Sequence, residues 1–88
     1  MRVIMFYRPN SEHAGRAQDY AEEYGRRHPG WTIELMDADG PEAVDKVRLY
    51  GITNYPAIVA LSNDGGLQQL WQDEQLPLMS ELDFYQQA

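Results

Sequence analysis

Hydrophobic and polar positions divide the chain into short segments of strand and helix character. Residues 2–7 are of strand length and continuously apolar after Arg2, which is typical of a strand buried on both faces of a sheet. A second such run covers residues 57–61. It is followed by Ser-Asn-Asp-Gly-Gly at residues 62–66, a strong hairpin signal, so residues 67–72 are predicted to pair with it as an antiparallel strand.

A further strand is indicated by alternation rather than by a continuous run. In residues 31–37, apolar and polar side chains alternate, with Trp31, Ile33 and Leu35 predicted on one face. A helical segment lies between these residues and the first strand. Strand, helix and strand in this order predict a right-handed parallel βαβ unit.

Three segments have the periodicity of amphipathic helices, residues 11–28, 41–50 and 77–86. Asn10 or Ser11 is expected to cap the first helix by accepting hydrogen bonds from its free backbone N–H groups. The side chains predicted to face the core are Ala14, Ala17, Ala21, Tyr24, Val44, Val47, Leu78, Leu82 and Tyr85.

The complete order, βαβ–α–ββ–α, predicts an α/β fold with a four-stranded mixed sheet and helices on both faces. With 88 residues, of which 43% are apolar, we expect a single domain, residues 1–88, with one modest core. The uninterrupted apolar stretches, such as residues 3–6 and 57–61, are far too short to span a membrane, and no signal peptide is recognisable. A cytoplasmic location is therefore expected.

Composition excludes several kinds of chemistry. The chain has no cysteine, so it has no disulfide, no thiol nucleophile and no thiolate metal ligand. Its formal net charge is −7 at pH 7, and residues 31–88 hold Lys46 and Arg48 against ten acidic residues. An acidic surface repels phosphates, so nucleic acids and anionic membranes are disfavoured as partners.

Three sequence elements, in their order along the chain, resemble the thioredoxin/glutaredoxin-like superfamily. A strand ending in Tyr-Arg-Pro at residues 7–9 precedes a helix, and the family's C-x-x-C motif would fall on Ser11 and Ala14. Tyr-Gly-Ile-Thr-Asn-Tyr-Pro at residues 50–56 then leads into an apolar strand, and Asn-Asp-Gly at residues 63–65 marks the hairpin. The resemblance covers nearly the whole chain and implies a thioredoxin-like fold.

The resemblance also implies a cis peptide bond between Tyr55 and Pro56, in a loop whose backbone groups pair with an extended peptide in the family. Dithiol–disulfide exchange requires thiolates, so no catalytic residue is assigned, and Ser11 and Ala14 are degenerate motif positions. We therefore expect a redox-inactive domain that binds a protein or peptide. The residues expected to form the binding surface are Tyr7, Arg8, Ser11, Glu12, His13, Tyr55 and Pro56.

An enzyme using the same site is the alternative, with Ser11 as nucleophile and His13 as base, or with a glutathione-like ligand beside Arg8. Two residues apart at a helix start, the Ser11 and His13 side chains are expected to project in different directions. The helix dipole is expected to keep His13 neutral. Because His13 and His28 lie at opposite ends of one helix, no metal is expected, and no cofactor is assigned. Association of identical chains through the edge of the last strand or Trp71 is a further possibility.

Overall fold

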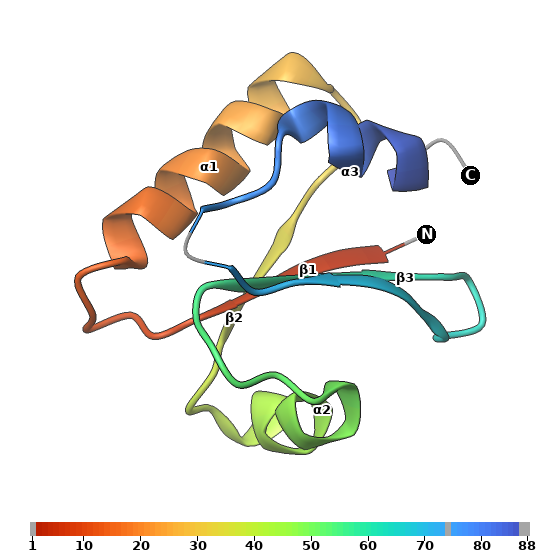
Figure 1. Ribbon diagram of the computed structural model, residues 1–88. Coiled ribbons are helices and arrows are strands. Elements are labelled where there is room, and N and C mark those ends of the chain that lie inside the picture. The colour runs from red at the N-terminus through yellow and green to blue at the C-terminus, as the bar shows by residue number, and fades with distance from the viewer. Residues whose placement is uncertain (1, 74, 87–88) are drawn as a thin grey trace.

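The computed structural model describes residues 2–73 and 75–86, which form a four-stranded sheet with helices on both of its faces (Figure 1). The elements are β1 (Arg2–Tyr7), α1 (Ala14–Arg27), β2 (Glu34–Asp37), α2 (Pro41–Tyr50), β3 (Ala57–Leu61), β4 (Leu67–Trp71) and α3 (Met79–Gln86).

The order of strands in the sheet is β2-β1-β3-β4, so the two apolar strands lie at its centre. β1 pairs with β2 in parallel, as the βαβ prediction requires, and β3 pairs antiparallel with both β1 and β4. The β3–β4 connection closes through Ser62, whose N–H donates to the carbonyl of Gly66 at 2.8 Å. Gly65 adopts a φ of 88° in this turn, a left-handed conformation that glycine accepts without steric cost. The predicted α/β class and mixed sheet are confirmed.

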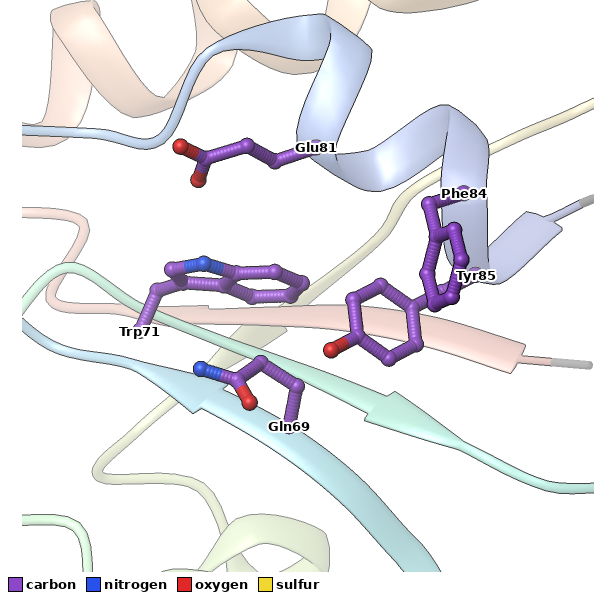
Figure 2. A pocket seen from close by; sticks show the side chains of 5 residues that line it. All are labelled: Gln69, Trp71, Glu81, Phe84 and Tyr85. Atoms are coloured by element: carbon purple, nitrogen blue, oxygen red, sulfur yellow. The ribbon is translucent and has the colours of Figure 1, made fainter.

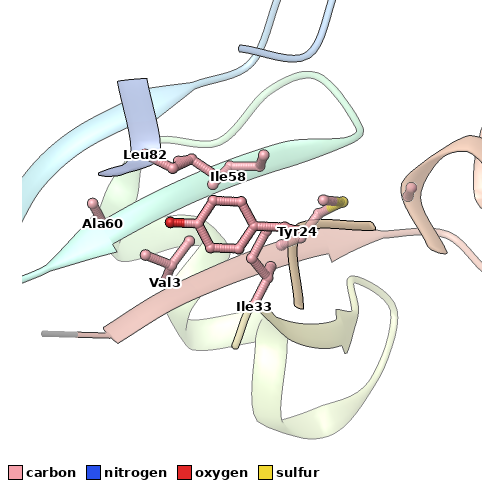
Figure 3. Close-up of a cluster of buried hydrophobic side chains, with 8 residues drawn as sticks. Val3, Tyr24, Ile33, Ile58, Ala60 and Leu82 are labelled. Atoms are coloured by element: carbon pink, nitrogen blue, oxygen red, sulfur yellow. The ribbon is translucent and has the colours of Figure 1, made fainter. Parts of the chain in front are cut away.

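Helices α1 and α3 cover one face of the sheet and α2 covers the other (Figure 1). Because side chains alternate along a strand, Val3 and Met5 of β1 face α1, whereas Ile4 and Phe6 face the α2 side. On the α1 side, the ring of Tyr24 packs among residues of the two central strands (Figure 3). This two-sided burial explains why β1 and β3 are continuously apolar.

Two residues that were predicted to face the core from helices are exposed. Val44 in α2 is 46% exposed, and Ala43 beside it is the residue that is fully buried. Leu78 is 69% exposed and lies just before α3, which begins at Met79, two residues later than predicted. Leu82, which was also predicted to face the core, is buried. The predictions for Val44 and Leu78 were therefore wrong. For Val44, the apolar periodicity left the rotation of α2 undetermined by one residue, and for Leu78 it placed the start of the last helix too early.

Two element starts also differ from the prediction. β2 begins at Glu34 and not at Trp31. The indole of Trp31 stacks on the ring of His28, with centroids 5.1 Å apart, so the chain joins the sheet only after this contact. α1 begins at Ala14, so the three residues before it form turns. Among residues 2–73 and 75–86, no helix is long and apolar enough to cross a membrane.

Candidate functional site

The predicted site lies where the end of β1 meets the start of β3. These strands are antiparallel neighbours with Phe6 opposite Ala57. The residues that follow β1 therefore lie beside Tyr55 and Pro56, which precede β3. The sheet register thus brings together two loops that are more than forty residues apart in the sequence.

Arg8, Ser11 and His13 form a closed ring of hydrogen bonds in the first loop. The backbone N–H of Arg8 donates to Nε2 of His13 at 3.1 Å, and Oγ of Ser11 lies 3.0 Å from Nδ1 of the same imidazole. The Ser11 hydroxyl donates to the carbonyl oxygen of Arg8 at 2.6 Å. Both polar groups of the Arg8 backbone are thereby bonded to side chains of the loop.

These partners determine the state of His13. Since Nε2 accepts from the Arg8 N–H, the proton of the neutral ring is on Nδ1. The Ser11 hydroxyl has one proton, which it donates to the Arg8 carbonyl, so Nδ1–H donates to Ser11 Oγ. Burial lowers the pKa of His13, and the nearby Arg16 and Arg8 guanidinium groups lower it further. A neutral His13 agrees with the sequence prediction, although burial is the main cause.

The prediction that Ser11 and His13 project in different directions was wrong. Side chains two residues apart diverge on a helix, but here both residues precede α1 and lie in turns. The predicted cap was also wrong. His13 is the N-cap residue of α1, no side chain caps the helix, and the Ser11 hydroxyl bonds to Arg8 instead.

The direction of the hydrogen bonds decides what chemistry this pair can perform. A general base must accept the proton of the nucleophile, as in a serine hydrolase. His13 donates to Ser11, and its second nitrogen already accepts from Arg8. Ser11 and His13 are therefore arranged to hold the loop and not to activate the hydroxyl.

The Arg8 side chain extends from this ring to the second loop. Its guanidinium carbon lies 4.8 Å from the centroid of the Tyr55 ring, a cation–π distance. Its Nε lies 3.7 Å from Oδ1 of Asp39, in an exposed pair that stabilises the fold little. Arg8 and Tyr55 line a hollow of about 450 Å³, together with Thr53 and Arg48.

The second loop is fixed by the side chain of Gln72, which directly follows β4. Oε1 of Gln72 accepts hydrogen bonds from the backbone N–H groups of Thr53 and Asn54, at 2.8 and 3.2 Å. The hydroxyl of Thr53 is 3.3 Å from the same oxygen. The peptide bond that follows Tyr55 is cis, and Pro56 is buried. Within the described part of the chain, neither the N–H nor the C=O of Tyr55 has a hydrogen-bond partner.

The structure does not bring every predicted residue into one surface. Tyr7 packs against the hydrophobic cluster on the α1 side, whereas Tyr55 packs against the cluster on the α2 side. The carbonyl of Tyr7 accepts from the N–H of Ala38 at 2.8 Å. Glu12 is exposed in the turn before α1. Arg8, Ser11, His13, Tyr55 and Pro56 are therefore the residues that form the junction of the two loops.

Sequence reasoning missed the residues that support the second loop. Thr53 is two positions before Tyr55 and lines the same hollow, so its proximity was available from the motif. Gln72 gave no such signal, because the pairing of β4 with β3 is what carries its amide to the loop. No cluster of three or more metal-ligating side chains occurs among the residues that the structure describes.

Comparison with known proteins decides what this fold is. The chain superposes on mitochondrial thioredoxin 3 of Saccharomyces cerevisiae with a TM-score of 0.69 and 21% identity, over 98% of this chain and 76% of that one. The fold is that of thioredoxin. The chain also superposes on the crystal structure of a designed protein, with a TM-score of 0.67 and 16% identity, over 98% of this chain and 72% of the designed one. No family model and no curated protein matches the sequence.

Within the thioredoxin fold, the start of α1 has no thiol, because the chain has no cysteine. Ser11 and Ala14, where the resemblance places the family's motif, cannot form a disulfide or a thiolate. This chain therefore has no thiol of its own with which to exchange a disulfide.

Proposed function

We propose that this chain is a redox-inactive thioredoxin-fold module that binds an extended segment of a partner protein across the junction of its two loops. The observation that carries the proposal is the backbone of Tyr55, whose two polar groups have no partner among the described residues. Backbone N–H and C=O groups are strong hydrogen-bonding groups, and an extended peptide supplies the complementary pair.

The surroundings of Tyr55 favour a peptide over a small molecule. The Tyr55 ring is half-buried and lies against the guanidinium of Arg8, which provides a rigid aromatic contact beside the free backbone. The N–H groups of Thr53 and Asn54 are already bonded to Gln72, so the N–H that this loop offers to a peptide is that of Tyr55. A net charge of −7 favours a protein partner over a nucleic acid.

An enzyme that uses Ser11 and His13 is less well supported. The orientation of the imidazole leaves the serine hydroxyl unactivated. A glutathione-like ligand has no observation in its favour beyond the proximity of Arg8. A cytoplasmic location remains part of the proposal and rests on the lack of cysteine, which suits a reducing compartment.

Peptides selected from a random-sequence display library on the immobilised protein provide a direct test. In 1H–15N spectra, the selected peptide should shift the amides of Tyr55, Ser11 and His13. Tyr55→Ala should weaken binding at least about tenfold, as expected for an aromatic hot spot. Tyr50→Ala is the matched control, because Tyr50 packs against the same hydrophobic cluster but does not line the hollow beside Arg8. Equal losses in both variants, or shifts confined to other surfaces, would overturn the proposal.

A further inference from the structure

A second hollow lies between β4 and α3, far along the chain from the two loops of the candidate site. It has a volume of about 330 Å³, near the lower limit of small-molecule pockets, and we call it the β4–α3 hollow. Its lining side chains are Gln69, Trp71, Glu81, Phe84 and Tyr85 (Figure 2).

Three aromatic rings form the walls of the β4–α3 hollow. The rings of Trp71 and Tyr85 have centroids 5.4 Å apart and planes at 82°, and those of Phe84 and Tyr85 are 5.1 Å apart at 84°. Because adjacent rings are perpendicular, their π-faces point in different directions, and in each pair the edge of one ring covers one face of the other. Each face carries the negative part of the ring quadrupole, which attracts a cation within about 6 Å of the centroid.

The charged side chain that lines the hollow is acidic. Glu81 is the charged residue of the lining, and in Figure 2 its side chain extends from α3 across the space above the indole of Trp71. Trp71 and Glu81 also line an adjacent hollow with Asp73. The sequence has no lysine, arginine or histidine after Arg48. No cation of the chain itself is therefore available from the segment that forms the hollow.

We propose that the β4–α3 hollow binds an alkylammonium group of the quaternary or methylated type. Such a group is apolar at its surface and carries a full positive charge. It suits aromatic faces, which bind it by the cation–π interaction, and a carboxylate, which supplies the counter-charge. A methylated lysine of a partner protein and a free quaternary amine such as choline share this chemistry.

Other occupants fit these observations less well. An anion would meet the carboxylates of Glu81 and Asp73 and the negative ring faces. A second copy of the chain that docked through the same hollow would bring Glu81 against Glu81, and like charges in contact are unfavourable. A neutral apolar group would fill the space but would gain no attraction from the carboxylate of Glu81 or from the negative ring faces.

The test uses choline and its neutral isostere 3,3-dimethyl-1-butanol, at low ionic strength, with binding followed by NMR. Choline should shift the indole N–H of Trp71 and the ring resonances of Tyr85, and the isostere should bind at least about tenfold more weakly. Equal binding of the two probes would show a merely apolar hollow and would overturn the proposal. Choline shifts located at Trp31 instead would also overturn it.

Two matched pairs of variants assign the contributions without disturbing the fold. Glu81→Gln should weaken choline binding about fivefold, the effect of one charge pair in contact in water, and Glu42→Gln in the first turn of α2 should not. Phe84→Ala should weaken it at least about twofold. The control is Leu49→Ala, since Phe84 and Leu49 are 71% and 75% exposed and neither supports the core. Wild-type affinity in both Glu81→Gln and Phe84→Ala would contradict the proposal.

A peptide carrying a single trimethyllysine distinguishes the two sources. Tighter binding of this peptide than of choline, with unmodified lysine weaker, would indicate a partner protein as the source. Tighter binding of choline would indicate a free amine. Failure of both probes to shift Trp71 would overturn the proposal, and it would leave the peptide surface at Tyr55 unaffected because the two sites share no residue.

Discussion

Asp83 of α3 accepts a hydrogen bond from the hydroxyl of Tyr24 of α1, at 3.1 Å, and so joins the two helices on one face of the sheet. The same carboxylate oxygen lies 3.0 Å from Nε2 of His28 at the end of α1. The Tyr24 ring lies 4.7 Å from the ring of His28, between centroids, and packs among apolar side chains of the central strands and of α3 (Figure 3). The position of α3 therefore depends on a polar contact at the edge of an apolar cluster.

Removing the Tyr24 hydroxyl should destabilise the protein without altering its fold. Tyr24→Phe keeps the buried ring and deletes the bond to Asp83, and we expect a loss of about 1 kcal/mol in the free energy of unfolding. Urea denaturation measures the change. In a double-mutant cycle, Asp83→Ala should cost less in the Tyr24→Phe background than in the wild type. Strict additivity would mean that the two side chains do not interact.

The two tyrosines of α1 make stability fall in alkaline solution. Burial raises the pKa of Tyr24 above its ordinary value of 10, and the hydrogen bond and charge of Asp83 raise it further. Burial also raises the pKa of Tyr20, whose hydroxyl donates to the carbonyl of Pro77 at 2.8 Å. Above a pH of about 10 the unfolded state loses these protons first, so stability declines as pH rises. Denaturation curves recorded across this range should show a smaller decline in Tyr20→Phe than in the wild type.

His13 makes the first loop sensitive to acid. Its pKa is lowered in the folded state, so its contribution to stability is complete above the unfolded value of about 6.5 and declines as pH falls through the folded pKa. Protonation of Nε2 would also displace the N–H of Arg8. NMR of the 15N-labelled ring at neutral pH should show the Nδ1–H tautomer, and acidification should shift the Arg8 amide. The Nε2–H tautomer at neutral pH would contradict the ring of hydrogen bonds.

Gln72 should determine the order of the loop before β3. Gln72→Ala removes the acceptor of the Thr53 and Asn54 amides. Because a hydrogen bond stabilises the loop by about 1 kcal/mol, we expect both amide protons to exchange with solvent roughly fivefold faster. Hydrogen–deuterium exchange measures the effect residue by residue. Gln68→Ala, at an exposed position of β4, the strand that Gln72 follows, is the control and should leave both amides unchanged.

The architecture was predictable because its signals are local. The continuous apolar runs of β1 and β3 can be buried only at the centre of a sheet with helices on both faces, and the turn at residues 62–66 sets the direction of β4. The rotation of short helices was less certain, as Val44 shows. An apolar residue beside an alanine fits either face, and packing against the sheet selected Ala43.

The candidate site was predictable as a place but not as a set of contacts. Motif spacing located Ser11, His13 and Tyr55 correctly at the ends of β1 and β3. The helix was expected to begin at residue 11, and this put Ser11 in the wrong conformation and hid its contact with His13. The role of Gln72 could not be predicted for another reason. Its hydrogen bond to Thr53 spans nineteen positions, so it depends on strand pairing and not on any local sequence pattern.

The ring of hydrogen bonds at Arg8, Ser11 and His13 has a thermodynamic consequence for any partner. The loop is already ordered by bonds within the chain, as is the loop held by Gln72. Docking onto preorganised segments loses little conformational entropy on this side of the interface. The entropic cost of association therefore falls mainly on the partner, so stiffening the partner's segment in its extended form should improve affinity more than any stiffening of this domain.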